Sequence, residues 1–242
     1  MDADLRVNAL YLSSRLRSRL ADAARCPVTT IIAPTGYGKT TAAQYLQRRI
    51  AAEAPDAYLF RQFLSGGGRQ EFWAGLCRAL HTAPQLSAQL RALGYPDSPH
   101  TRQQLLELVQ DALPAQRPVW FILDDVHLLQ GGEAAELVSF LAERLPLQVH
   151  LLLLSRNQIF SEAQKLRLGS RLLELSAADL RLTQEELAQY AGLCGLPLPE
   201  RESQALLSVS EGWIAMIYLI FRAYAQTGTW RFDTKGMDTL IE

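Results

Sequence analysis

Short apolar runs alternate with longer amphipathic stretches along most of the chain. Residues 28–32 are β-branched and lie between Pro27 and Pro34. An apolar run bounded in this way is typical of a strand that is buried on both faces of a parallel sheet. The pattern predicts five such strands, at residues 28–32, 58–60, 119–123, 149–154 and 171–175.

The stretches between these strands have the spacing of helices. After Lys39, the residues Ala42, Leu46 and Ile50 recur every four positions and so share one helical face. Strands that alternate with helices in this way form a parallel sheet with helices on both faces. Further helices of this α/β region are expected at residues 71–81, 102–113 and 133–145.

After residue 175 the pattern becomes wholly helical. Thr183 followed by Glu186 is a capping box, which predicts a helix that continues through Tyr190. Two more helices are expected, at residues 199–209 and 214–225.

Three parts are therefore expected in chain order. Residues 1–25 form a lead-in with a short helix that Ser14 can cap. Residues 26–178 form an α/β domain, and residues 179–242 form a helical subdomain. A chain of 242 residues can bury one good core and still have room for a small second domain.

The composition is that of an ordinary globular chain, with 48% hydrophobic and 20% charged residues. A net charge of −1 means that the chain lacks the strong basic field that attracts nucleic acid or an anionic membrane. Cys26, Cys77 and Cys194 are isolated in the sequence, and this spacing argues against a zinc site and against a disulfide framework. The longest apolar run, at residues 213–221, is too short to span a bilayer, and the N-terminus has no secretory pattern. We expect a cytoplasmic protein without a membrane partner.

The loop after the first expected strand contains Gly-x-Gly-Lys-Thr and opens a helix. Backbone N–H groups in such a loop face phosphates, the lysine reaches the β and γ phosphates, and the first hydroxyl after it coordinates Mg²⁺. Lys39 and Thr40 take these roles here, and Ala33 stands where the full pattern has its first glycine. The sequence thus predicts a nucleotide-binding P-loop. The residues expected to bind the nucleotide are Pro34, Thr35, Gly36, Tyr37, Gly38, Lys39, Thr40 and Thr41.

Polar residues also follow two later strands, as Asp124-Asp125 and as Ser155-Arg156. Open α/β sheets bind ligands at the carboxyl ends of their strands. We expect Asp124 to hold Mg²⁺ together with Thr40, and Asp125 to orient or deprotonate the attacking water. Arg156 has two open roles: it senses or stabilises the γ-phosphate, or it pairs with an aspartate and holds an inactive state. The expected catalytic residues are Asp125, Lys39 and Arg156.

Two further residues are assigned structural roles, packing or hydrogen bonding for His127 and packing for Trp213. His127 lies two positions beyond Asp125, but no second histidine stands at a metal-ligand spacing, so no metal other than Mg²⁺ is indicated. Trp213 is expected to pack a helical core, because large aromatic side chains dominate cores. Its alternative role is to close over the nucleotide.

Five motifs occur in order along the chain. They are Ala-Pro-Thr-Gly-Tyr-Gly-Lys-Thr-Thr (33–41), Phe-Ile-Leu-Asp-Asp-Val-His-Leu-Leu (121–129), Leu-Leu-Ser-Arg-Asn (153–157), Leu-Leu-Glu-Leu (172–175) and Glu-Gly-Trp-Ile-Ala (211–215). Together they resemble the ATPase module of MalT-like, large LuxR-type transcriptional regulators, a branch of the STAND signalling ATPases. The resemblance runs from about Arg15 to Ala225. It implies a P-loop NTPase sheet of the ASCE/AAA+-like type with a C-terminal helical subdomain.

The resemblance also implies a mechanism. Members of this family rest as ADP-bound monomers, an inducer and ATP favour an open form that self-associates, and hydrolysis resets the switch. Adenine as the base is implied only by the family. DNA would be bound through a helix-turn-helix domain that this chain lacks. The triple glycine at residues 66–68 departs from relatives, which tend to carry acidic residues there.

Three other functions stay open beside a slowly hydrolysing ATP/ADP switch. A P-loop small-molecule kinase should carry a mobile arginine-rich lid, whereas the segment after Arg156 offers Arg167 and Arg171 without an obvious glycine hinge. A module that only holds ADP is the second alternative. A nucleic-acid motor is disfavoured by the near-neutral charge and the lack of interleaved basic and aromatic residues.

Overall fold

The computed structural model describes residues 10–113, 117–129 and 131–232. These residues form two compact units. The sheet unit comprises residues 18–34 and 39–176, and the helical unit comprises residues 10–17, 35–38 and 177–232. The glycine loop, residues 35–38, thus groups with the helical unit although it connects a strand and a helix of the sheet unit.

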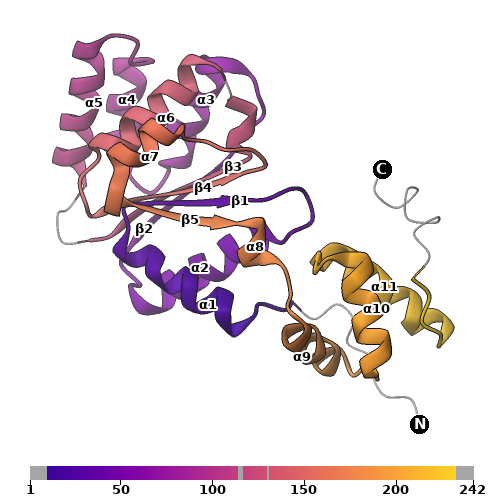
Figure 1. Ribbon diagram of the computed structural model, residues 1–242. Coiled ribbons are helices and arrows are strands. Elements are labelled where there is room, and N and C mark those ends of the chain that lie inside the picture. Colours follow the sequence, from indigo (N-terminus) through magenta and orange to yellow (C-terminus); the bar gives the residue numbers. More distant parts are fainter. Residues whose placement is uncertain (1–9, 114–116, 130, 233–242) are drawn as a thin grey trace. The chain divides into compact units, whose positions relative to one another are not determined.

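Five parallel strands form the sheet, in the order β2-β3-β4-β1-β5 (Figure 1). The strands are β1 (Val28–Ile32), β2 (Tyr58–Phe63), β3 (Val119–Asp124), β4 (Val149–Ser155) and β5 (Leu172–Ser176). The predicted five-stranded parallel sheet is therefore confirmed. The neighbouring strands β1 and β4 are followed by connections that run in opposite directions: the chain goes from β1 to β2 at one edge of the sheet and from β4 to β5 at the other. Open α/β sheets bind ligands where the direction of the connections reverses in this way.

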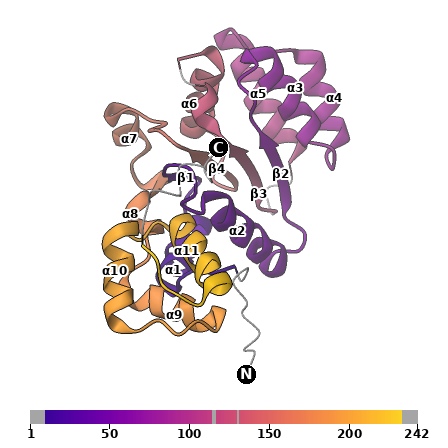
Figure 2. The same ribbon diagram turned by 90° about the vertical axis from the view of Figure 1, so that its right-hand side faces the viewer.

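Helices cover both faces of this sheet. Figures 1 and 2 show α3, α4, α5 and α6 on one face and α2 on the other. The core under the larger group includes Phe60, Phe121 and Leu151, which lie opposite one another on β2, β3 and β4 and so point to one face. The helices of the sheet unit are α2 (Lys39–Glu53), α3 (Gly68–Ala79), α4 (Pro84–Leu93), α5 (Pro99–Ala112), α6 (Glu133–Arg144) and α7 (Glu162–Leu168), with short 3₁₀ turns at Asp22–Arg25, Val126–Leu129 and Gly169–Arg171.

Two of these helices, α4 and α7, were not among the predicted elements. Pro84 occupies the first turn of α4, and Leu86 and Leu90, four residues apart, are buried. The seven residues of α7 include the exposed Leu166, so its apolar pattern is weak. Its signal is the capping box that Ser161 begins, with Gln164 at the third helical position.

The helical unit contains α8 (Ala177–Leu180), α9 (Gln184–Cys194), α10 (Glu200–Ser210) and α11 (Ile214–Thr227). The predicted capping box begins α9: Glu186 N–H donates to Thr183 Oγ1 at 3.3 Å, and Thr183 N–H donates to Glu186 Oε2 at 3.0 Å. The unit has its own core, in which Leu187, Ile217 and Phe221 are fully buried.

Helix α1 (Ser14–Ala21) is the predicted lead-in helix. Its cap differs from the expectation, because Leu16 N–H donates to Ser13 Oγ at 3.2 Å and Ser14 is the first helical residue. Within the described ranges, no helix is long and apolar enough to cross a membrane.

Candidate functional site

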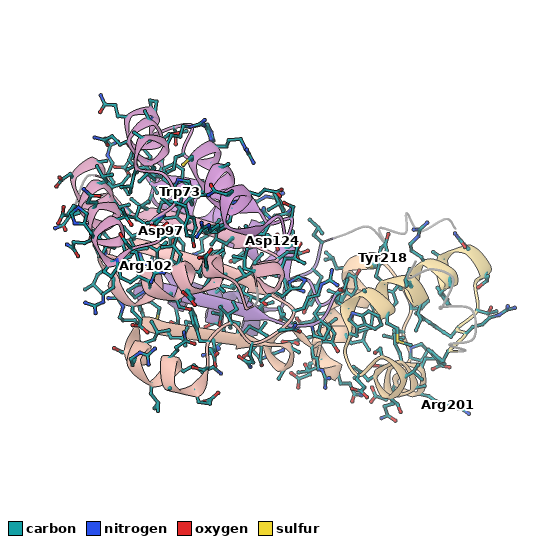
Figure 3. The ribbon with its side chains drawn as sticks, turned by 90° about the horizontal axis from the view of Figure 1, so that it is seen from above. Trp73, Asp97, Arg102, Asp124, Arg201 and Tyr218 are labelled. Atoms are coloured by element: carbon teal, nitrogen blue, oxygen red, sulfur yellow. The ribbon has the colours of Figure 1, made fainter. Side chains whose placement is uncertain are left out.

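The carboxyl ends of β1, β3 and β4 meet at one edge of the sheet. Ile32 pairs with Ser155 at the ends of β1 and β4. Leu123 of β3 pairs with Leu153 of β4, two residues before Ser155. Asp124 follows as the last residue of β3, and Figure 3 labels it where the strands end. The sequence motifs at these strand ends are thus brought together, as parallel pairing requires.

Lys39 is the buried cation at this edge. Its Nζ donates to Ala33 O at 2.8 Å and to Pro34 O at 2.9 Å, so two of its three N–H groups bond to the carbonyls that follow β1. Burial, and then the positive charge of Arg156, lower the pKa of the Lys39 ammonium, while Asp125 and Asp124 act in the opposite direction. Lys39 therefore shares one electrostatic environment with three of the other predicted site residues.

Asp124 is buried, and both of its carboxylate oxygens accept hydrogen bonds. Oδ1 accepts from the backbone N–H of Asp125 at 3.1 Å. Oδ2 accepts from Arg61 Nη2 at 3.0 Å. The guanidinium of Arg61 also donates through Nη1 to Gln47 Oε1 at 2.9 Å, and its Cζ lies 4.5 Å from the centre of the Phe63 ring. Residues of α2 and β2 therefore fix this arginine against Asp124.

Arg61 was not among the predicted site residues. The second strand was expected to end at Phe60, which left Arg61 in a connection, whereas β2 continues to Phe63. In the sheet register, Arg61 lies opposite Ile122, and Phe63 lies opposite Asp124. Because side chains alternate along a strand, Arg61 and Asp124 emerge on the same face, two register positions apart. If the second strand had been predicted to end at Phe63, the register would have placed Arg61 near Asp124.

Asp125 has a left-handed backbone with φ of 61°. This conformation is uncommon for residues other than glycine, and aspartate is among the side chains that tolerate it. Its carboxylate is partly exposed, and Oδ1 lies 3.8 Å from His127 Nδ1. Burial lowers the pKa of His127, against the opposing effect of Asp125. His127 Nδ1 is buried without a hydrogen-bond partner among the described residues, and its role beside the site stays a prediction.

Arg156 is exposed just beyond the end of β4. Its charge lowers the pKa of both Lys39 and His127, which places it within electrostatic range of the site. In the part of the chain that the structure describes, Arg156 makes no ion pair with Asp124 or Asp125. The pairing with Asp124 that the sequence left open for Arg156 is made by Arg61 instead.

The glycine loop packs within the helical unit. Gly36 and Gly38 have φ of 80° and 83°, so both need the conformational freedom of glycine. A Cβ at Gly36 would lie 2.7 Å from Trp213 Nε1, and the rings of Tyr37 and Trp213 stack with centroids 6.1 Å apart. Trp213 also packs against the helical core, as predicted. Its Nε1 is buried and has no hydrogen-bond partner among the described residues.

The remaining loop residues differ in their exposure. Pro34 and Thr35 are exposed, Lys39 is the first residue of α2, and Thr40 and Thr41 follow it in the first turn. A first helical turn offers free backbone N–H groups to an anion.

A cavity of about 390 Å³ lies at the end of β2 in the sheet unit. Its lining includes Arg61, the triple glycine at residues 66–68, and Arg78 of α3.

Among the described residues, no group of three or more His, Cys, Asp or Glu side chains could hold a metal ion by itself. A Mg²⁺ site here would therefore need ligands from a bound molecule, as is usual for Mg²⁺ bound with phosphates.

Comparisons with known proteins agree with this geometry. The sequence is 27% identical over 229 residues to the HTH-type transcriptional regulator MalT of Serratia proteamaculans, an alignment that covers 93% of this chain and 25% of the regulator. The MalT of Klebsiella pneumoniae is 26% identical over 223 residues. The predicted resemblance to MalT-like ATPase modules is thereby confirmed, and the chain spans about a quarter of the length of these relatives.

Two solved structures share the fold at low sequence identity. One is a Signal Transduction ATPase with Numerous Domains (STAND) protein with a tetratricopeptide repeat sensor from Pyrococcus horikoshii. It has a TM-score of 0.57 at 17% identity, covering 88% of this chain and 30% of that one. The other is AMPPCP-bound DnaA from Aquifex aeolicus, with a TM-score of 0.51 at 13% identity, covering 99% of this chain and 72% of that one.

A family model settles membership. Residues 22–156, more than half of the chain, match the model described as an AAA domain, and they contain the glycine loop, Arg61, Asp124 and Arg156. This chain belongs to the AAA domain family of P-loop proteins.

Proposed function

We propose that this chain is an ATP- and ADP-binding switch module that hydrolyses ATP slowly, of the kind carried by MalT-like regulators. The observation that carries the proposal is geometric: Lys39 Nζ bonds to Ala33 O and Pro34 O at the carboxyl edge of the sheet, where Asp124 ends β3 and Arg156 follows β4. The lowered pKa of Lys39, to which Arg156, Asp125 and Asp124 contribute after burial, agrees with this arrangement. Three charged groups around one buried lysine, beside a glycine loop, suit a phosphate chain and its metal ion better than a purely structural role. The AMPPCP held by the DnaA neighbour supports nucleotide binding.

Each predicted site residue has a place in this function. The backbone N–H groups of residues 34–41 would bind the phosphates, and Lys39 would exchange its bonds to Ala33 O and Pro34 O for the β and γ phosphates. A threonine hydroxyl and an aspartate are donors that suit Mg²⁺, so Thr40 and Asp124 would hold it. Mg²⁺ would neutralise charge on the phosphates.

Two residues would serve the hydrolysis step. The partly exposed Asp125 carboxylate would orient the attacking water or accept its proton. Arg156 would sense the γ-phosphate and stabilise the charge that develops on it, since among the residues that the structure describes it has no competing ion pair with either aspartate.

The switch itself is proposed from the relatives. Nucleotide would bias two arrangements of the protein through contacts that differ between them, and self-association would accompany one of these arrangements. The MalT relatives are named as HTH-type regulators, so DNA binding would belong to a helix-turn-helix domain outside this sequence. Such a regulator acts in the cytoplasm.

A module that only holds ADP is the second candidate. The observation in its favour is that both oxygens of Asp124 are bonded by the chain's own donors, which opposes recruitment of Mg²⁺. Measuring both ATP binding and ATP turnover separates the two candidates, because both bind nucleotide but only the switch hydrolyses ATP.

The first experiment has two parts. One sample of the purified protein is denatured, and any released nucleotide is identified by chromatography; we expect ADP at near one per chain. A second, folded sample is freed of nucleotide, and its affinity for ATP and ADP is measured by calorimetry; we expect dissociation constants in the micromolar range. Lys39→Ala should weaken binding by at least about a hundredfold, because a charge-assisted contact to phosphate is lost. Arg49→Ala is the control, since Arg49 lies on the same helix and pairs with Glu53. Equal affinity in wild type and Lys39→Ala would refute the P-loop assignment.

A further inference from the structure

The Arg61–Asp124 pair is built as a fixed contact. Only 17% of the Arg61 side chain and 5% of the Asp124 side chain are exposed. The guanidinium is anchored to Gln47 and packs over Phe63 as well as bonding Asp124, so three neighbours hold its position. A largely buried arginine held in this way neutralises the carboxylate without any metal ion.

The other cations of the site do not share this role. Lys39 Nζ donates to two backbone carbonyls and has no direct bond to Asp124. Arg156 is exposed and, within the described residues, unpaired with Asp124. Arg61 therefore supplies the cationic hydrogen bond that the structure gives to this carboxylate.

We propose that Arg61 is a built-in counter-cation for Asp124 that competes with Mg²⁺ for the carboxylate, so that this protein binds adenine nucleotides almost independently of Mg²⁺. The inference deepens the proposed function and rests on it. It assigns a charge-neutralising role to an edge-strand arginine, and it concerns the affinity for nucleotide rather than the hydrolysis step.

The physical reason is a competition between two cations for one buried anion. Mg²⁺ binds carboxylates through oxygen lone pairs and dehydrates reluctantly, so it gains most from an anion that is otherwise unpaired. With Arg61 in place, the ion pair already stabilises the Asp124 carboxylate, so Mg²⁺ binding to it releases less free energy. With a neutral side chain at position 61, Asp124 would be a buried unpaired charge, and Mg²⁺ would become its main partner.

The test compares dissociation constants for ADP and ATP in excess Mg²⁺ and in EDTA, measured by calorimetry. In the wild type, we expect affinities that differ by less than about threefold between the two conditions. In Arg61→Met, which keeps the length and apolar stem of the side chain, we expect binding at least about tenfold tighter with Mg²⁺ than with EDTA. Arg61→Lys keeps the charge and should stay near the wild type. Arg49→Met is the matched control, because Arg49 forms its ion pair with Glu53 on α2.

The outcomes separate this inference from the proposed function. Nucleotide binding with the same Mg²⁺ dependence in wild type and Arg61→Met would overturn the role of Arg61 and leave the proposed function standing. A wild type whose binding depends on Mg²⁺ by more than about threefold would overturn it too, even if Arg61→Met did not fold. A wild type that binds no nucleotide in either condition would refute both.

Discussion

At the scale of single residues, the site is defined by how its charges are satisfied. Asp124 is bonded on both oxygens, whereas the neighbouring Asp125 keeps a partly exposed carboxylate. Two adjacent aspartates therefore have different environments, and a difference of this kind lets two carboxylates take different roles. Asp124 is already paired with the guanidinium of Arg61, whereas Asp125 suits contact with water.

This difference makes a prediction for Asp125→Asn. The amide removes the negative charge that would orient or deprotonate water, so ATP turnover should fall at least about tenfold, while nucleotide affinity stays within about threefold of wild type. Asparagine tolerates the left-handed φ of 61°, so the backbone should not change. Phosphate release and calorimetry measure the two quantities. Unchanged turnover would show that Asp125 is not the acid that serves hydrolysis.

The sequence predicted Asp124, Asp125, Lys39 and Arg156, because each follows a strand that could be recognised, or lies in the loop motif. It did not predict Arg61. An arginine inside an edge strand carries no motif, and its partner is set by strand register, which depends on pairing between distant segments. Charge pairs across strands are therefore the part of the site that a single sequence conceals.

At the scale of elements, strong periodicity was the reliable signal. Four of the five strands lie within two residues of their predicted ends, and the exception is β2, an edge strand with the mixed pattern Tyr58–Phe63. The helices that escaped prediction, α4, α7 and α8, are short, with 10, 7 and 4 residues. Tertiary packing rather than intrinsic propensity stabilises helices of this length, so their sequence signal is weak.

The turn before α11 gives a prediction at this scale. Gly212 has φ of 76°, and a Cβ there would lie 2.5 Å from Leu182 O and 2.9 Å from Leu182 N. The same two segments are joined by a hydrogen bond from Leu182 N–H to Gly212 O at 3.0 Å. Gly212→Ala should therefore lower the free energy of unfolding by about 3 kcal/mol, since it combines left-handed strain with a clash against backbone. Urea denaturation followed by circular dichroism measures the change.

Gly228→Ala provides the matched control. Gly228 caps α11 with φ of 69°, and a Cβ there would meet nothing within 4 Å. This change should cost only the left-handed strain, about 1–2 kcal/mol. If Gly212→Ala were no more destabilising than Gly228→Ala, the close approach of Gly212 to Leu182 would not stabilise the helical unit.

At the scale of the whole molecule, the α/β class followed from the order of elements, because alternating strands and helices leave few ways to bury both faces of a sheet. The strand order β2-β3-β4-β1-β5 did not follow from that pattern. Nor did the grouping of residues 35–38 with the helical unit, which depends on contacts with Trp213, far away in the sequence. Local pattern fixes which elements form, and long-range contacts fix which of them meet.

Stability of the molecule should fall in mild acid because of His150. The residue is 7% exposed, its ring stacks on Trp120 with ring centroids 4.2 Å apart, and its Nδ1 lies 3.1 Å from Cys26 O. Burial lowers the pKa of His150, although the hydrogen bond to Cys26 O acts in the opposite direction. The unfolded chain then binds a proton near pH 6.5 while the folded protein does not.

The free energy of unfolding should accordingly be constant above about pH 6.5 and should decrease below it, by up to about 1.4 kcal/mol per pH unit, until His150 protonates in the folded state. His127, whose pKa is also lowered by burial, adds to the slope. Urea denaturation at several pH values between 7.5 and 5 measures this dependence. His150→Gln should reduce the slope, because glutamine does not titrate, whereas His100→Gln, at an exposed position of α5, should leave it unchanged. Equal slopes in wild type and His150→Gln would mean that His150 is not the buried neutral group, and that the acid sensitivity of the fold arises elsewhere.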